Sequence, residues 1–205
     1  MQKALVKYGL VGKPNITTIC RDFLGITKEE YLDVINICIQ DMKRAKQFFS
    51  PLITAPKVVE KIKEIYDRVN SKPVELGEEC FDYTVMIGVH SQINAFIEHV
   101  WSFFLAASGK LDDKVAKCTM DENNILMPRI NEALLNLTKS TAFIGFELWE
   151  NGRNCTVQGA AQACIDLMKR IDEKEVINDV CWQDVWSLKR GVSYNMVIYK
   201  ANIVK

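Results

Sequence analysis

The chain has 205 residues, of which 48% are hydrophobic and 25% charged, as in ordinary globular proteins and unlike disordered ones. Its 26 basic and 26 acidic side chains give a formal net charge of zero, so the basic excess with which nucleic-acid-binding proteins neutralise phosphates is missing. Residues 76–151 carry 5 basic and 11 acidic groups, which we interpret as a solvated acidic surface rather than a docking site for a basic partner.

The seven cysteines are scattered along the chain, and no two are closer than nine residues. This spacing excludes the CxxC pairs of zinc and redox sites, so we expect buried free thiols, no metal and no cofactor. The N-terminal residues lack the long apolar region of a signal peptide. We therefore expect a reducing intracellular compartment, either the cytoplasm or, for a viral or parasite protein, the interior of a host cell.

Two amphipathic helices are predicted first in chain order. Residues 27–49 begin with a capping box, in which Thr27 and Glu30 bond to each other's backbone, and continue with apolar residues at alternating four- and three-residue steps. Residues 50–70 carry a second apolar stripe of Val58, Ile62, Ile65 and Val69.

The segment from about 80 to 107 is predicted to be the apolar central helix. It is long enough to cross a membrane, but Ser91, Asn94 and Glu98 lie in its middle, which excludes a membrane span. His90 and His99 are nine residues apart and cannot bind one metal from the same helix face. What remains is one polar strip, Ser91, Glu98, His99 and Ser102, on an otherwise apolar helix.

Three more helices are predicted after the break at "SGKLDDK". They cover residues 123–152, with Pro128 near the start, residues 156–174, with small residues first, and residues 175–191. The chain ends, residues 3–11 and 193–204, alternate weakly and could form a two-stranded pairing of the termini. The predicted fold is all-α, a single helical domain of residues 1–205 with about six helices.

The predicted function is a non-catalytic one, because recognisable phosphate-binding loops and nucleophile motifs are absent. We expect binding of a protein partner or self-association, with neither nucleic acid nor a membrane involved. Trp182 and Trp186, spaced i and i+4, are candidate anchors for such a partner.

Two alternatives stay open at this point. One is a small-ligand-binding protein or enzyme with a pocket beside His90, Asn94, Glu98 and His99. The other is a DNA-binding regulator, because residues 16–35 have the outline of a helix-turn-helix motif. Acidic residues in its second helix argue against the latter.

Overall fold

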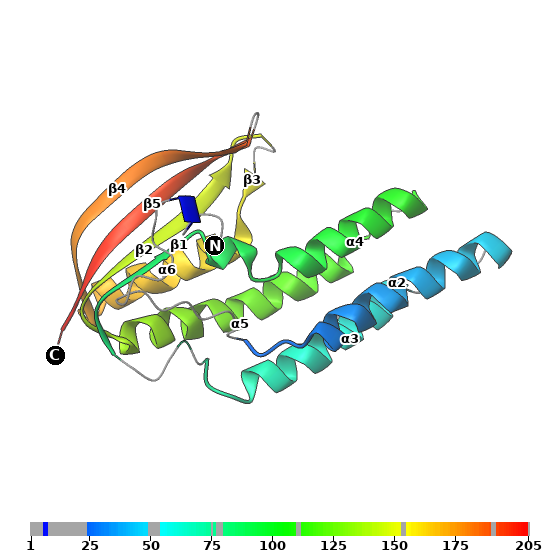
Figure 1. Ribbon diagram of the computed structural model, residues 1–205, viewed down its shortest axis with the longest axis horizontal. Helices are drawn as coiled ribbons and strands as arrows, with labels where there is room; N and C mark the ends of the chain where they lie inside the picture. Colours follow the sequence, from blue (N-terminus) through cyan, green and yellow to red (C-terminus); the bar gives the residue numbers. More distant parts are fainter. Residues whose placement is uncertain are drawn as a thin grey trace.

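A computed structural model describes residues 6–7, 24–48, 54–74, 76, 80–109, 112–152, 155–189 and 192–204. This part of the chain forms five α-helices and five strands, so the fold is mixed α/β and the all-α prediction is wrong. Four helices extend away from a curved sheet at one end of an elongated molecule (Figure 1).

The helical end contains α2 (Lys28–Phe48), α3 (Thr54–Asn70), α4 (Ala95–Ser108) and the first half of α5 (Lys114–Asn136). The first two confirm the helices predicted from the apolar stripes. All four stripe residues of α3 are buried, each at most 4% exposed. Amphipathic periodicity therefore identified the helices that pack one face on a neighbour.

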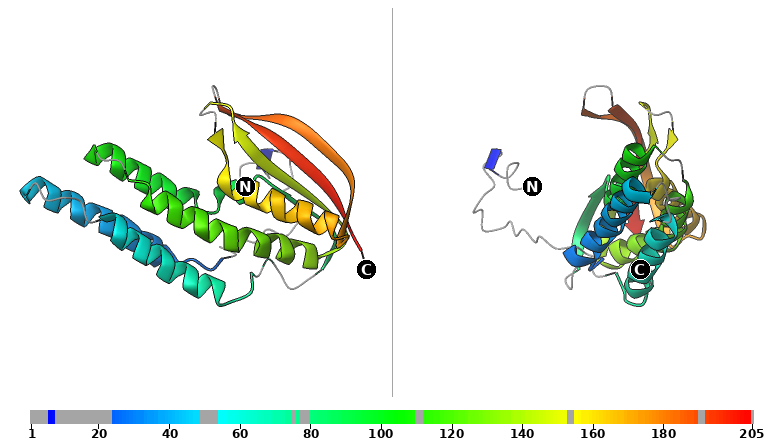
Figure 2. Two further views of the ribbon diagram at one scale, coloured as in Figure 1. Left: turned by 180° about the vertical axis from the view of Figure 1, so that it is seen from behind. Right: turned by 90° about the vertical axis from the view of Figure 1, so that its right-hand side faces the viewer.

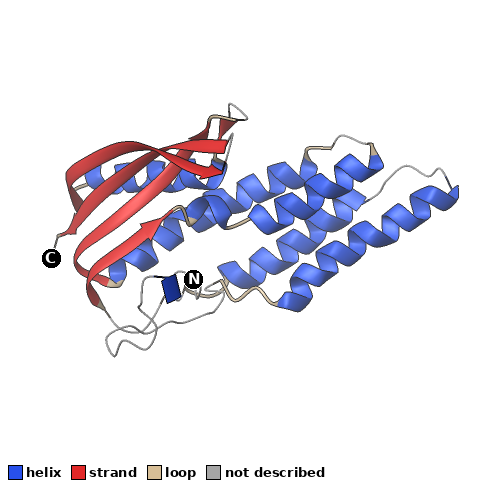
Figure 3. Cartoon of the chain, turned by 45° about the horizontal axis from the view of Figure 1, so that its top comes forward, coloured by secondary structure: helices blue, strands red, loops and turns tan. Residues whose placement is uncertain are grey.

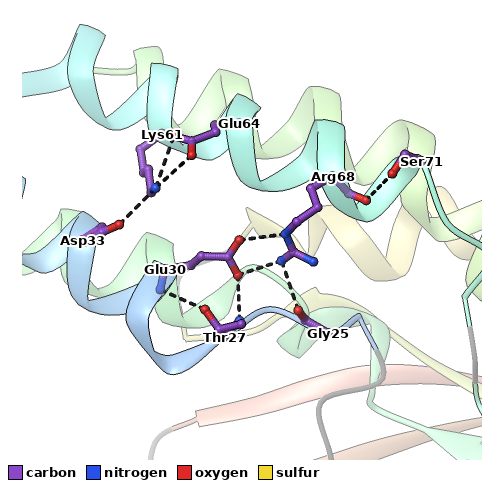
Figure 4. A network of polar contacts seen from close by, with 8 residues as sticks. All are labelled: Gly25, Thr27, Glu30, Asp33, Lys61, Glu64, Arg68 and Ser71. Carbon is purple, nitrogen blue, oxygen red and sulfur yellow. Dashed lines mark hydrogen bonds and ion pairs between the residues drawn. The ribbon is translucent and has the colours of Figure 1, made fainter.

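The capping box at the start of α2 is confirmed, and it joins α2 to α3 (Figure 4). The Thr27 amide donates to Glu30 Oε2 at 2.7 Å, and the Glu30 amide donates to Thr27 Oγ1 at 3.2 Å. The Arg68 guanidinium of α3 also donates to both carboxylate oxygens of Glu30, at 2.8 and 2.7 Å. One carboxylate thus caps its own helix and holds the next one.

The sheet contains β1 (Phe81–Ile87), β2 (Thr138–Glu150), β3 (Cys155–Thr156), β4 (Val176–Lys189) and β5 (Val192–Ile203). The strand order is β1-β2-β5-β4, and the short β3 also pairs with β2. Only the β1–β2 pair is parallel. The chain must therefore cross over between β1 and β2, and α4 and α5 lie in that connection.

One face of the sheet packs on α6 (Gln158–Asp172) and on the second half of α5 (Figures 1 and 3). Helix α5 runs through both ends of the molecule and has buried residues in both. The core of the sheet end is made by inward residues of β2 together with α5 and α6: Leu126, Met127, Ile130, Ala142, Ile144, Phe146, Ala163 and Leu167.

The predicted central helix at 80–107 is wrong in its first half. Residues 81–87 are strand β1, and the chain then turns at Gly88, which has a φ of +68°, into the short 3₁₀ helix η1 (His90–Gln92). Only α4 is helical as predicted. It buries Ile97, Trp101 and Phe104 but exposes Phe103 at 65%, so α4 lies at the periphery and α5 is the central helix.

The helix predicted for residues 123–152 is wrong in both bounds. Helix α5 begins at Lys114, which places Pro128 in its interior rather than near its start. After Asn136 the chain continues as strand β2, buried on both faces over much of its length. Such a strand is apolar without alternation, and its Thr141, Ile144 and Leu148 imitate helical spacing by chance.

The segment 175–191 is predicted as a helix, but its residues 176–189 form strand β4 instead, and residues 190–191 lie outside the described residues. The segment is rich in valine, isoleucine and tryptophan, which favour strands. The predicted helix at 156–174 is confirmed as α6.

The strand predicted at residues 193–204 is confirmed as β5, but its two edges pair with β2 and β4, so the predicted pairing with the N-terminal segment is wrong. Its N-terminal half, residues 3–11, lies outside the described residues except for 6–7.

Candidate functional site

One face of the sheet is covered by no α-helix of the described residues (Figures 1 and 2). This face carries apolar side chains. We call it the outer sheet face, the side opposite α5 and α6. The pairing register places on it residues from all four long strands: Tyr83, Val85 and Ile87 of β1, Phe143 of β2, Met196 and Ile198 of β5, and Val180, Trp182 and Trp186 of β4.

Several of these apolar side chains are accessible to an extent that is unusual in a folded chain, whereas Met196 in the middle of the face is only 4% exposed. Tyr83 and Val85 are 68% and 67% exposed, and Trp182 and Trp186 are 44% and 39% exposed. Single exposed apolar residues are common on proteins, but contiguous apolar patches are typical of binding surfaces.

Contacts between strands make the outer sheet face continuous. The rings of Phe143 and Trp182 stack with centroids 6.4 Å apart across the intervening β5. The side chains of Ile87 and Ile198 both lie above Gly145. An added Cβ at Gly145 would lie 3.0 Å from Ile87 and 3.3 Å from Ile198. The apolar surface therefore runs without interruption from β1 to β4.

A buried carboxylate borders this apolar surface at one end. Glu147 of β2 is 4% exposed, and Ser91 Oγ from η1 donates a hydrogen bond to its Oε2. An added Cβ at Gly88 would lie 2.9 Å from the Trp186 ring and 3.1 Å from Glu147 Oε1. Glycine at position 88 therefore leaves room for the indole and the carboxylate together. We call Gly88, Ser91, Glu147 and Trp186 the carboxylate niche.

His90 lies on the opposite side of the sheet, in the core between α5 and α6. Its Nε2 lies 3.0 Å from Asn131 Oδ1, and Asn131 in turn donates to Asp166 at 2.9 Å. Burial lowers the pKa of His90 to about 4, against smaller opposing effects of Asn131 and Asp166. The ring is therefore neutral at pH 7, and its buried Nδ1 has no hydrogen-bond partner among the described residues.

Asn94 belongs to a second buried network, in the helical end. Tyr66 Oη of α3 donates to Asn94 Oδ1, and Asn94 Nδ2 donates to Asn123 Oδ1 of α5 at 2.7 Å. Asn94 is 4% exposed, so its amide holds three segments of the chain together. This role is structural and leaves the amide no free donor toward a ligand at the observed geometry.

Glu98 and His99 lie on the exposed side of α4. Desolvation of the Glu98 carboxyl raises its pKa, and a hydrogen bond with Thr119 opposes that rise. The His99 ring packs edge-on against Phe103, with centroids 4.7 Å apart. The structure therefore places the four residues of the predicted pocket in two separate buried networks and on a helix surface.

The predicted tryptophan pair does share one face, although on a strand rather than a helix. Residues i and i+4 lie on the same side of both a helix and a strand, which is why the spacing alone found the pair. The residues of β1, β2 and β5 that extend the outer sheet face were not predicted from the sequence. Alternation in "FDYTVMI", with Phe81, Tyr83, Val85 and Ile87 at every second position, is the signal that could have found β1.

Five cysteines are free thiols: Cys38, Cys118 and Cys164 are buried, whereas Cys80 and Cys181 are exposed. In this part of the chain no group of three or more metal-ligating side chains is placed to hold a metal ion. None of the described helices has both the length and the apolar character that a membrane span needs. The chain matches no family model, no curated protein and no solved structure.

Proposed function

We propose that this protein acts non-catalytically, by binding a protein partner through the outer sheet face. The observation that supports the proposal is the contiguous apolar surface across four strands, with two tryptophans 44% and 39% exposed. Tryptophan is enriched among the residues that dominate binding energies, because it buries a large rigid surface at little entropic cost.

The alternative of a ligand pocket has less support in the geometry. Such a pocket needs polar groups that converge on one space, whereas His90 and Asn94 bond to different residues of α5 and His99 lies on an exposed surface. The DNA-binding alternative would use the first turn of α2. There Glu30 is bound to Arg68, and Glu29 would repel phosphates.

A selection of randomised displayed peptides on the immobilised protein tests the proposal. The recovered peptides are then measured against two matched variants. Val85→Ser removes an apolar side chain of the outer sheet face that is 67% exposed, and Ile165→Ser removes one of α6 that is 68% exposed.

We expect Val85→Ser and Trp182→Ala to weaken binding by about tenfold or more, with Ile165→Ser unchanged. Analytical ultracentrifugation of the same variants detects self-association as the other form of protein binding. Peptides that depend on Ile165 and are indifferent to Val85 and Trp182 would refute this face as the binding surface.

A further inference from the structure

The outer sheet face carries two carboxylates in one row across the sheet. Glu147 of β2 pairs in register with Met196 of β5, and Met196 pairs with Asp184 of β4. Two strand spacings separate the carboxylate-bearing positions, about 10 Å. Lys200 lies on the same face, but it is four residues from Met196 along β5, or about 13 Å. This end of the face therefore has negative groups without a neighbouring cation among the described residues.

The indole of Trp186 lies beside both carboxylates. It is two residues from Asp184 on the same side of β4, and its ring reaches the Gly88 position next to Glu147. An indole face attracts a cation, and the attraction is strongest where water is excluded. A carboxylate on either side of an indole is the arrangement that recognises a guanidinium or ammonium group.

Glu147 has the properties of an anchor rather than a surface charge. It is 4% exposed, and the only hydrogen bond to its carboxylate from the described residues comes from the neutral hydroxyl of Ser91. A buried carboxylate is costly unless a charge or several donors compensate it. Glu147 Oε1 lies on the side of Gly88 and Trp186, at the end of the apolar surface, where a partner's cation would approach.

We infer that the partner of the outer sheet face presents an arginine or lysine side chain to the carboxylate niche, where it lies against Trp186 and over the buried Met196, with Glu147 on one side and Asp184 on the other. The inference rests on the proposed function and names the chemistry of the partner: an apolar segment with a basic residue at one end. The apolar part covers Val85, Phe143 and Trp182, and the cation supplies a counter-charge that no described side chain gives Glu147.

The peptides selected on the wild-type protein test this inference through a double-substitution cycle. On the protein, Glu147→Gln keeps the volume and the acceptor for Ser91 while removing the charge, and Glu132→Gln removes an exposed charge of α5 as the matched control. On the peptide, glutamine replaces the basic residue. This measurement uses the wild-type protein, so it stays informative even if a protein variant folds poorly. Binding is measured by titration calorimetry.

We expect the selected peptides to be enriched in arginine and lysine next to apolar residues. Either substitution, Glu147→Gln or the peptide change, should weaken binding by about tenfold or more, and the two together should weaken it little further. Glu132→Gln should leave the affinity unchanged.

Two different failures are distinguishable. Peptides that need Val85 and Trp182 but bind Glu147→Gln as tightly as wild type would overturn the basic anchor and leave the proposed function standing. Absence of any peptide that depends on Val85 and Trp182 would overturn both.

Discussion

His90 Nε2 and Asn131 Oδ1 lie 3.0 Å apart in the core, and this contact links η1 to α5. Asn131 Nδ2 also donates to the Ala163 carbonyl of α6 at 2.7 Å, so one amide joins three segments. The histidine ring is 2% exposed, and its centroid lies 5.1 Å from that of Phe146, with the two ring planes tilted by 42°. A charged imidazolium is therefore disfavoured in the folded state.

This contact predicts a specific loss of stability in acid. Burial lowers the pKa of His90 from 6.5 to about 4, so between these values the unfolded chain binds a proton that the folded chain does not. The protein therefore has its full stability with respect to His90 above pH 6.5. As the pH falls from 6.5 toward 4, the unfolding free energy decreases by about 3 kcal/mol at most.

Urea unfolding at several pH values measures this dependence. His90→Gln should flatten the curve between pH 6.5 and 4 relative to wild type, whatever its effect on absolute stability. His99→Gln, on the exposed side of α4, should keep the wild-type slope. An unchanged slope in His90→Gln would assign the acid sensitivity to other groups.

The hydrogen bond from Tyr66 to Asn94 predicts coupled stability effects between α3 and the start of α4. Tyr66→Phe leaves the buried Asn94 Oδ1 without that donor, which should cost about 1–3 kcal/mol. Asn94→Ala should cost more, because it also removes the donor to Asn123. In a double-substitution cycle followed by denaturant unfolding, the combined loss should be smaller than the sum. Strictly additive losses would contradict the bond.

For Gly159, in the first turn of α6, the structure predicts that alanine destabilises the protein, the opposite of its usual effect in a helix. An added Cβ would lie 2.5 Å from the backbone carbonyl oxygen of His90, closer than a real Cβ can approach. Alanine normally stabilises a helix relative to glycine by about 1 kcal/mol. Here we expect Gly159→Ala to destabilise the protein by about 1–3 kcal/mol, because η1 and α6 must separate. A higher melting temperature for the variant would refute this packing.

Local sequence patterns predicted those elements of the fold in which burial of a single face determines the spacing of the apolar residues. Helices α2, α3 and α6 each bury one stripe, which repeats at helical spacing in the sequence. Strand β2 carries apolar side chains on both faces, the inward Ile144 and the outward Phe143, so no alternation marks it. For β4, the spacing of Trp182 and Trp186 fits a strand and a helix equally.

The candidate site could be predicted only where its residues are neighbours in sequence. The tryptophan pair lies within one strand, but Val85 comes next to Phe143 through the parallel pairing of β1 and β2, more than fifty residues apart. Glu147 and Ser91 likewise meet across 56 positions. Such contacts depend on strand order and register, which follow from the packing of the whole chain rather than from local spacing.

Two basic residues of α3 face α2 in different ways (Figure 4). Arg68 forms two parallel hydrogen bonds to Glu30, whose side chain is 18% exposed, and donates to the Gly25 carbonyl at 3.0 Å. Lys61 pairs with Asp33 and Glu64, which are 54% and 69% exposed. The first arrangement is bidentate and shielded, whereas water screens the second.

Arg68 and Lys61 should therefore differ in their effect on stability. Burial of Glu30 opposes its ionisation, but hydrogen bonds from Thr27 and Arg68 outweigh this and lower its pKa. We expect Arg68→Ala to reduce the unfolding free energy by about 1–2 kcal/mol at pH 7, and Lys61→Ala by less than about 0.5 kcal/mol. The Arg68 contribution should fall as the pH drops below 4.5, because protonation of Glu30 removes the charge. Equal losses for the two variants in urea unfolding would mean that the bidentate pair has no advantage over the exposed one.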